Sequence, residues 1–141
     1  MDQFRAVDGS RWALFRAHDV PFNAPPEEVL LRRWRIVQTP LFGVYLHRHI
    51  RPDWFRDMHD HPYSFVTWVL RGAYRENRIA AKPLTWRQWS VHYMRAEWPH
   101  SILELTEVPT WTLMFVGRRR RDWGFVTDDG WVSHKTYLNL T

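Results

Sequence analysis

Residues 58–72 read MHDHPYSFVTWVLRG, with His59 and His61 one residue apart and a hydrophobic run that ends at Gly72. In a β-strand, residues i and i+2 project from the same face, about 7 Å apart along the chain. Their imidazoles can therefore converge on one cation at bond lengths of roughly 2 Å. Asp60 would point away from both rings. We expect a strand here that carries a candidate metal-binding face.

Outward from this segment, short hydrophobic runs separated by turn residues extend from about Trp34 to the end of the chain. They are RIVQ, FGVYLHRHI, SFVTWVL, AYRENRI, LTWRQW, VHYM, SILELT and TWTLMFV, with a last strand expected near GWVSHKTYL. Many short strands at this spacing are typical of a sandwich or barrel. We predict an all-β barrel domain over residues 34–141. Residues 1–33 are expected to form an arm with a short helix, because APPEEVLLRRW has prolines and glutamates where a helix begins.

The composition limits the chemistry. The chain of 141 residues is long enough for one domain with one core, and it contains no cysteine. Any metal must therefore be bound by nitrogen and oxygen ligands. We found no run of 18 apolar residues and no apolar signal sequence near the start, so we expect a cytoplasmic protein that does not enter a membrane. The net charge of +5 comes almost entirely from arginine.

A second pair, His47 and His49, has the same spacing, so spacing alone does not identify a site. The residues after His59 distinguish the two pairs. They resemble the first motif of the cupin superfamily, in which two histidines one residue apart are followed by a glutamate and then by a glycine, here Gly72. Residues 89–100, WSVHYMRAEWPH, resemble the second motif, with His100 at the histidine position. In this second segment the two glycines and the proline of the motif are replaced, by Trp89, Glu97 and Arg95 respectively.

The resemblance covers about residues 40–116 and implies a single jelly-roll barrel, the double-stranded β-helix of the cupins. It also implies that His59, His61 and His100 bind one divalent metal. Phe65, or Ser64 with a shorter gap, stands where the cupin glutamate would be, so the usual ligand set is incomplete. A three-histidine set is similar to the cysteine dioxygenase branch, which favours iron(II); zinc, nickel and manganese are the alternatives.

Glu76 is a candidate replacement for the missing acid. If Arg71-Gly72 forms a two-residue hairpin turn, Tyr74 and Glu76 pair with inward-facing residues and share their face. A buried carboxylate needs a partner or a cation, so Glu76 could act as fourth ligand or as general acid or base. The alternative is an ordinary strand glutamate paired with a neighbouring arginine.

Other residues are open to two interpretations. His92, eight residues before His100, is either a ligand or a strand-face histidine. Arg95 and Tyr74 could orient a substrate, Arg95 by forked hydrogen bonds to an anionic group. Most arginines, however, simply cover the surface. Arg118–Arg121 suit contacts to phosphate, or ion pairs with nearby aspartates.

We therefore expect a metal-binding cupin that is a mononuclear enzyme acting on a small molecule, with oxygen-dependent oxidation ahead of isomerisation or hydrolysis. The second hypothesis is a non-catalytic module that binds a ligand or helps to build an assembly, for example a homodimer through strand edges. An arginine-driven nucleic-acid binder ranks last.

Overall fold

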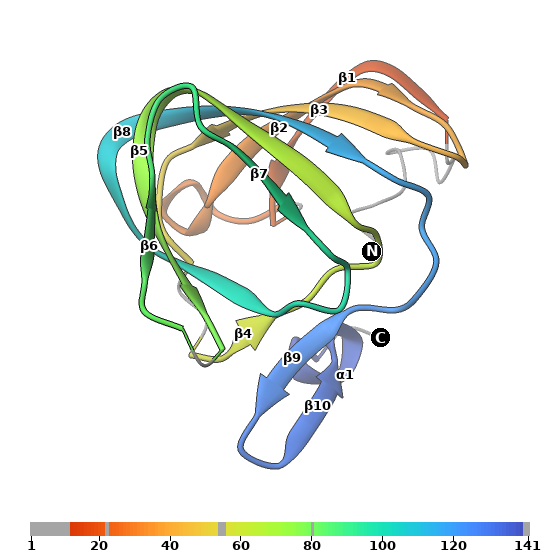
Figure 1. Ribbon diagram of the computed structural model, residues 1–141. Helices are drawn as coiled ribbons and strands as arrows, with labels where there is room; N and C mark the ends of the chain where they lie inside the picture. The colour runs from red at the N-terminus through yellow and green to blue at the C-terminus, as the bar shows by residue number, and fades with distance from the viewer. Residues whose placement is uncertain (1–11, 22, 54–55, 80, 140–141) are drawn as a thin grey trace.

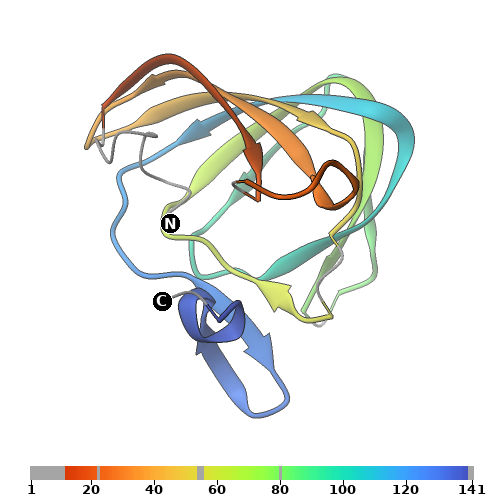
Figure 2. The same ribbon diagram turned by 180° about the vertical axis from the view of Figure 1, so that it is seen from behind.

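The computed structural model describes residues 12–21, 23–53, 56–79 and 81–139. These residues form ten strands joined in one antiparallel sheet, which curves into a barrel (Figures 1 and 2). The all-β fold predicted from the sequence is confirmed. The strands are β1 (Ala13–Val20), β2 (Leu31–Gln38), β3 (Gly43–His49), β4 (Met58–His59), β5 (Phe65–Arg78), β6 (Leu84–Trp86), β7 (Val91–Met94), β8 (His100–Val116), β9 (Gly124–Thr127) and β10 (Gly130–Ser133).

The two longest strands, β5 and β8, pair with each other along most of their length and bend from one wall of the barrel to the other (Figure 1). The first half of β5 also pairs with β7, and its second half pairs with β6. On its other side, β8 pairs with β3 near its end and with β4 at its start. The two long strands therefore connect the walls and bring His100 opposite His59.

The sequence patterns predict two short strands in place of each of the long strands β5 and β8. The prediction of a hairpin turn at Arg71–Gly72 is wrong, because β5 continues through these residues. Gly72 has a φ of +84° and lies where the register between β5 and β8 shifts. A Cβ at this position would lie 2.8 Å from Oγ1 of Thr110. The glycine thus permits a β-bulge and a close approach of β5 to β8; it does not form a turn.

The described part of the segment expected as a partly helical arm contains the strand β1 and the start of β2. β1 pairs antiparallel with β2, from Ala13 opposite Gln38 to Val20 opposite Leu31. Helical structure in the described part of this segment is limited to one 3-10 turn at Pro26–Glu28. The prolines and glutamates do begin a turn, but the alternation of side chains from Leu31 onward continues as a strand. The predicted boundary at residue 33 falls inside β2, and the division into an arm and a barrel domain stays a prediction.

The chain continues beyond β8 into a hairpin of β9 and β10, followed by the short helix α1 (His134–Tyr137). The hairpin and α1 lie at one end of the barrel (Figure 1). No helix in the described ranges is long and apolar enough to cross a bilayer. Tyr137 and Leu138 of this end pack against the main buried apolar cluster, which comprises Tyr45, Tyr63, Phe65, Met94, Met114, Val116, Trp123 and Phe125.

Candidate metal centre

Three histidine rings converge on the inner wall of the barrel. His59 ends β4, His61 follows two residues later, and His100 begins β8 directly opposite His59. One ring nitrogen from each histidine lies within 4.8 Å of the others, and the ring centroids are 4.8–5.1 Å apart. Among the described residues, this is the group in which three metal-ligating side chains converge. Three imidazoles at this spacing can bind a single metal ion.

Burial keeps the rings of His59 and His61 neutral. Burial, partly offset by the Asp53 carboxylate, lowers the pKa of His59 to about 4. Burial also lowers the pKa of His61 well below its ordinary value, and the charges of His100 and His59 add to this effect. His59 and His61 are therefore neutral at pH 7, the form in which imidazole has a lone pair for a metal.

The carboxylates of Glu76 and Asp53 lie close to ring nitrogens of His100 and His59, respectively. Nδ1 of His100 hydrogen-bonds to Oε2 of Glu76 at 3.0 Å, which leaves Nε2 of His100 for a metal. Oδ2 of Asp53 lies 3.9 Å from Nδ1 of His59. Carboxylates in such positions hold a metal-bound ring in place and raise its basicity. Nδ1 of His59 and Nδ1 of His61 are both buried without a hydrogen-bond partner among the described residues.

These donors fit a transition metal. Each ring offers a nitrogen that no other described group occupies, and an orphaned buried nitrogen such as Nδ1 of His61 is costly. Imidazole ligands suit iron, zinc and nickel, whereas manganese more often takes oxygen ligands. The donor set therefore favours the first three metals.

Asp60 anchors the backbone between His59 and His61. It is buried on the side away from the two rings, as its strand position predicted. Its carboxylate accepts hydrogen bonds from the N–H of Gly124 at 2.7 Å and from the indole N–H of Trp131 at 2.9 Å. Asp60 also pairs with Arg121 at 2.9 Å, and Arg121 donates to the carbonyl of His61 at 3.0 Å. These contacts fix the backbone that presents two of the three rings.

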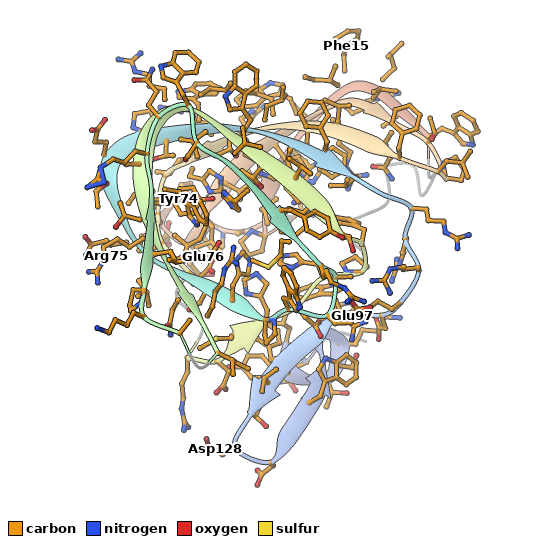
Figure 3. The ribbon with its side chains drawn as sticks, viewed as in Figure 1. Phe15, Tyr74, Arg75, Glu76, Glu97 and Asp128 are labelled. Carbon is orange, nitrogen blue, oxygen red and sulfur yellow. The ribbon has the colours of Figure 1, made fainter. Side chains whose placement is uncertain are left out.

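Tyr74 and Glu76 lie inside the barrel, whereas Arg75 between them lies on its outside (Figure 3). This inward direction agrees with the sequence prediction, although no hairpin produces it. The register shifts around Gly72 change which alternate residues face inward. As a result, buried residues fall on odd numbers before Gly72 and on even numbers after Ala73.

Both oxygens of Glu76 are engaged, Oε2 with His100 and Oε1 with Nε of Arg78. Burial acts to raise its pKa, but the hydrogen bonds and charges of His100 and Arg78 outweigh this and lower the pKa of Glu76 to about 2. The carboxylate is therefore ionised at neutral pH. The geometry suits a residue that orients His100 better than it suits a fourth ligand.

A cavity of about 380 Å³ extends from the three rings into the barrel. Much of its wall is aromatic or aliphatic, yet seven of the eight histidines line it. These are His47, His49, His59, His61, His92, His100 and His134. The pair that the sequence set aside, His47 and His49, therefore faces the same cavity from β3. The spacing of this pair is visible in the sequence, but the direction in which it faces depends on the pairing of β3 with β2 and β8.

Hydrogen bonds hold the additional histidines in place. Nε2 of His92 lies 3.0 Å from the hydroxyl of Tyr74, and its ring stacks on Trp86 with centroids 4.0 Å apart. Nε2 of His49 lies 3.2 Å from Oγ1 of Thr112. These partners supply the polar contacts that buried imidazoles require.

Arg95 lies outside the cavity. It follows the end of β7, its side chain is 56% exposed, and it pairs with Glu97 at 3.7 Å. It is not placed to orient a substrate at the three rings, because the turn after Met94 directs it to solvent. Arg33 lines the cavity instead, and its Nε donates to Nε2 of His47 at 2.9 Å. Sequence reasoning missed Arg33, which lies within a run of arginines that resembles surface charge.

The arginine run occupies the loop between β8 and β9 and makes contacts within the chain. Arg119 lies 3.8 Å from Asp122, and Arg120 pairs with Glu97. Arg121 binds Asp60, as described above. Three of the four arginines are thus paired with carboxylates of the same molecule. This agrees with the interpretation of the run as a source of ion pairs within the chain.

No protein-family model matches the sequence, and a search of curated proteins finds no match. Solved structures do match. An RmlC-like cupin from Shewanella frigidimarina NCIMB 400 superposes with a TM-score of 0.58 at 10% identity, over 79% of this chain and 96% of that one. The chain has the cupin fold.

Two proteins whose descriptions name a metal also match this cupin fold. Oxalate decarboxylase from Bacillus subtilis, described with Mn(II) centres, matches with a TM-score of 0.54 at 13% identity, over 79% of this chain and 30% of that one. The protein described as FeII HppE matches with a TM-score of 0.56 at 11% identity, over 72% of this chain and 55% of that one. At these identities the likeness concerns the fold. It confirms the cupin fold predicted from the sequence.

Proposed function

We propose that this cupin is a mononuclear metal-dependent enzyme that acts on a small molecule, with iron(II) as the favoured metal. The observation that carries the proposal is the convergence of three histidines, two of them held neutral by burial, on the wall of a cavity of about 380 Å³. Structural metal sites use four protein ligands, whereas three ligands leave a position for a substrate. The cavity size falls within the range typical of small-molecule sites.

His59, His61 and His100 would hold the metal, which supplies a Lewis acid with open coordination positions when bound. Glu76 holds the ring of His100 in its orientation, as a positioning residue. Burial raises the pKa of Tyr74 well above its ordinary value, so its hydroxyl stays protonated on the cavity wall, where it hydrogen-bonds with Nε2 of His92.

Arg33 takes the role that the sequence gave to Arg95. Among the described residues that line the cavity, Arg33 is the permanently charged cation, and Asp53 is the acidic residue. The carboxylate of Asp53 already accepts the N–H of Ile102 at 2.8 Å. A substrate with one anionic group, such as a carboxylate, would pair with Arg33 while its apolar part contacts the aromatic wall.

The reaction class rests on the three-histidine set and its likeness to the cysteine dioxygenase branch. We therefore propose oxygen-dependent oxidation ahead of isomerisation or hydrolysis, in the cytoplasm. The non-catalytic cupin is the alternative for the same cavity. Nucleic-acid binding ranks last, because Arg119, Arg120 and Arg121 are paired within the chain.

Metal analysis tests the proposal. Protein from cells grown with added iron, zinc, nickel and manganese should contain close to one transition metal per chain by elemental mass spectrometry. His59→Ala, His61→Ala and His100→Ala should each reduce this to background. His49→Gln is the matched control, because His49 lines the same cavity outside the three-ring group, and it should keep its metal. Wild-type protein with background metal would reject the proposal.

Oxygen uptake then tests the reaction. Iron-loaded protein should consume oxygen with a member of a panel of small thiols, phenols and keto acids, and Arg33→Met should raise the KM for anionic members at least tenfold without loss of metal. Full metal content with no uptake across the panel would favour the non-catalytic alternative.

A further inference from the structure

One wall of the barrel has an outward face made almost wholly of apolar side chains. This wall contains six strands, in the spatial order β7, β5, β8, β3, β2 and β1. Figures 1 and 2 show β1, β2 and β3 beside the end of β8 on one side of the barrel. Because alternate residues of a strand point to opposite faces, the same strands that line the cavity also present this outer face.

The strand registers align the outward residues in two rows that cross all six strands. Neither row contains a charged side chain. The first row is Tyr93, Val66, Phe115, Val44, Val37 and Leu14. The second row is Val91, Trp68, Leu113, Leu46, Trp34 and Ala17.

Further aromatic residues extend the two rows, which we call the apolar face. Trp89 lies 6.0 Å from Trp68, and Trp98 lies 6.1 Å from Tyr93, measured between ring centroids. Trp89 is 62% exposed, and Tyr93 is 52% exposed. Seven of its residues are between 36% and 65% exposed, and with ~200 Å² for a fully exposed large side chain their exposed parts alone sum to roughly 700 Å². A monomer rarely exposes a patch of this size without an interaction that uses it.

The border of the apolar face is charged. The next aligned row contains Asp19, Arg32 and Arg48, and Arg32 lies 3.4 Å from Asp19. An apolar centre with a polar rim is the arrangement found at protein interfaces. Because the centre carries no charge, its partner must also present an apolar surface.

We propose that the apolar face binds the apolar face of a second copy of this chain, forming a two-fold dimer. A standard stable interface buries about 800 Å² from each partner, which the apolar face can supply. A two-fold interface uses the same patch on both subunits, so an uncharged, aromatic face is its own complement. The sequence suggested dimers through strand edges; this proposal uses the face of the sheet instead.

The dimer is independent of the proposed metal centre. The two rows point outward, whereas the three histidines lie on the inner side of the barrel. A variant that separates the subunits should therefore keep its metal, and a variant without metal should still dimerise. The two proposals can fail separately.

Sedimentation velocity and light scattering on the full chain test the proposal. Wild-type protein should have twice the mass of 17.2 kDa at micromolar concentration. Trp68→Glu and Phe115→Glu place a carboxylate in the apolar face and should each raise the dimer dissociation constant at least 30-fold. Leu103→Glu is the matched control, because Leu103 lies on β8 outside the two rows and its exposure of 42% is close to the 44% of Phe115. It should stay dimeric.

Circular dichroism confirms that each variant is folded. A wild-type protein that is monomeric at 100 μM overturns the proposal, as does a dimer that both face variants leave intact. If the monomeric protein instead binds phosphatidylcholine vesicles or a different protein through Trp68, the face serves another partner, and the dimer is again rejected.

Discussion

Glu76 connects the candidate metal centre to the rest of the barrel. Its side chain is fully buried, with Oε2 on Nδ1 of His100 and Oε1 on Nε of Arg78. A carboxylate in this position fixes both the tautomer and the orientation of the ring that it contacts. The other nitrogen of His100 is thereby directed toward the metal position.

Glu76→Gln should weaken metal binding 10–100-fold, because the amide keeps the shape and loses the charge that holds His100. Competition with a chromogenic chelator would measure the affinity. Glu104→Gln is the control: Glu104 pairs with Arg75 on the surface at 3.6 Å and should leave the affinity unchanged. Equal affinities for Glu76→Gln and wild type would contradict this assignment.

At the level of single residues, local patterns located the three histidine rings that the structure brings together, whereas their binding of a metal stays a prediction. His59 and His61 are two residues apart in an extended segment, and the second motif located His100. Asp53 and Arg33 were missed, because each reaches the cavity only through pairing or packing with segments distant in sequence. Arg95 was misplaced for the converse reason: its motif position was clear, but the turn after β7 directs it outward.

At the scale of elements, the strand β5 shows why patterns of hydrophobicity divided one strand into two. Gly72 and the polar residues around it resemble a turn, and most two-residue turns with glycine do close hairpins. Here β5 and β8 are long enough to span both walls, and the bulge bends them as a pair. The alternation of short strands was therefore predictable, whereas their continuity depends on a partner far along the chain.

Gly72→Ala should destabilise the protein by about 2 kcal/mol. The new Cβ would lie 2.8 Å from Oγ1 and 3.0 Å from Cα of Thr110, and a φ of +84° is unfavourable for alanine. Urea denaturation followed by circular dichroism measures this loss. Gly117→Ala is the control, because its Cβ would meet only an ordinary contact at 3.5 Å, and it should change stability by less than about 0.5 kcal/mol. A similar effect for both variants would contradict the role given to Gly72.

The short strand β4 depends on the hairpin of β9 and β10 through Asp60. Asp60→Asn should cost about 3 kcal/mol, because it removes the charge that pairs with Arg121 in a largely buried setting. It should also weaken metal binding, since both neighbours of Asp60 are metal-site histidines. Denaturation and chelator competition measure the two effects.

Asp128→Asn provides the comparison for Asp60→Asn. Asp128 pairs with Arg56 at 2.8 Å, but both side chains are highly exposed, and such pairs contribute little. Asp128 lies on the β9–β10 hairpin, away from the barrel (Figure 3). If the two aspartate variants had the same stability, Asp60 would not anchor the segment.

At the scale of the whole molecule, the barrel contains an unusual number of buried imidazoles. Burial, together with the charges of nearby arginines, lowers the pKa of His18 to about 3. Burial, partly offset by Asp53, lowers the pKa of His49 to about 4, compared with an ordinary value of 6.5. In the unfolded chain these groups bind protons near pH 6.5, so protonation favours unfolding as the pH falls.

The metal-free protein should therefore lose stability steadily between pH 6.5 and 4. Each such histidine contributes up to roughly 3 kcal/mol above this window, and that contribution is lost by pH 4 for His49. The urea midpoint measured from pH 7.5 to 4.5 should fall, and His49→Gln should fall less steeply than wild type. An unchanged midpoint over this range would contradict the buried, neutral state of these rings.

The pairing of β4 with β8 has a consequence for the order of events in the cell. During synthesis, His59 and His61 leave the ribosome before His100 exists as a strand partner, so the nascent chain offers two imidazoles and no third. Metal capture is therefore expected to follow closure of the barrel. Once bound, the ion would favour the closed barrel by mass action.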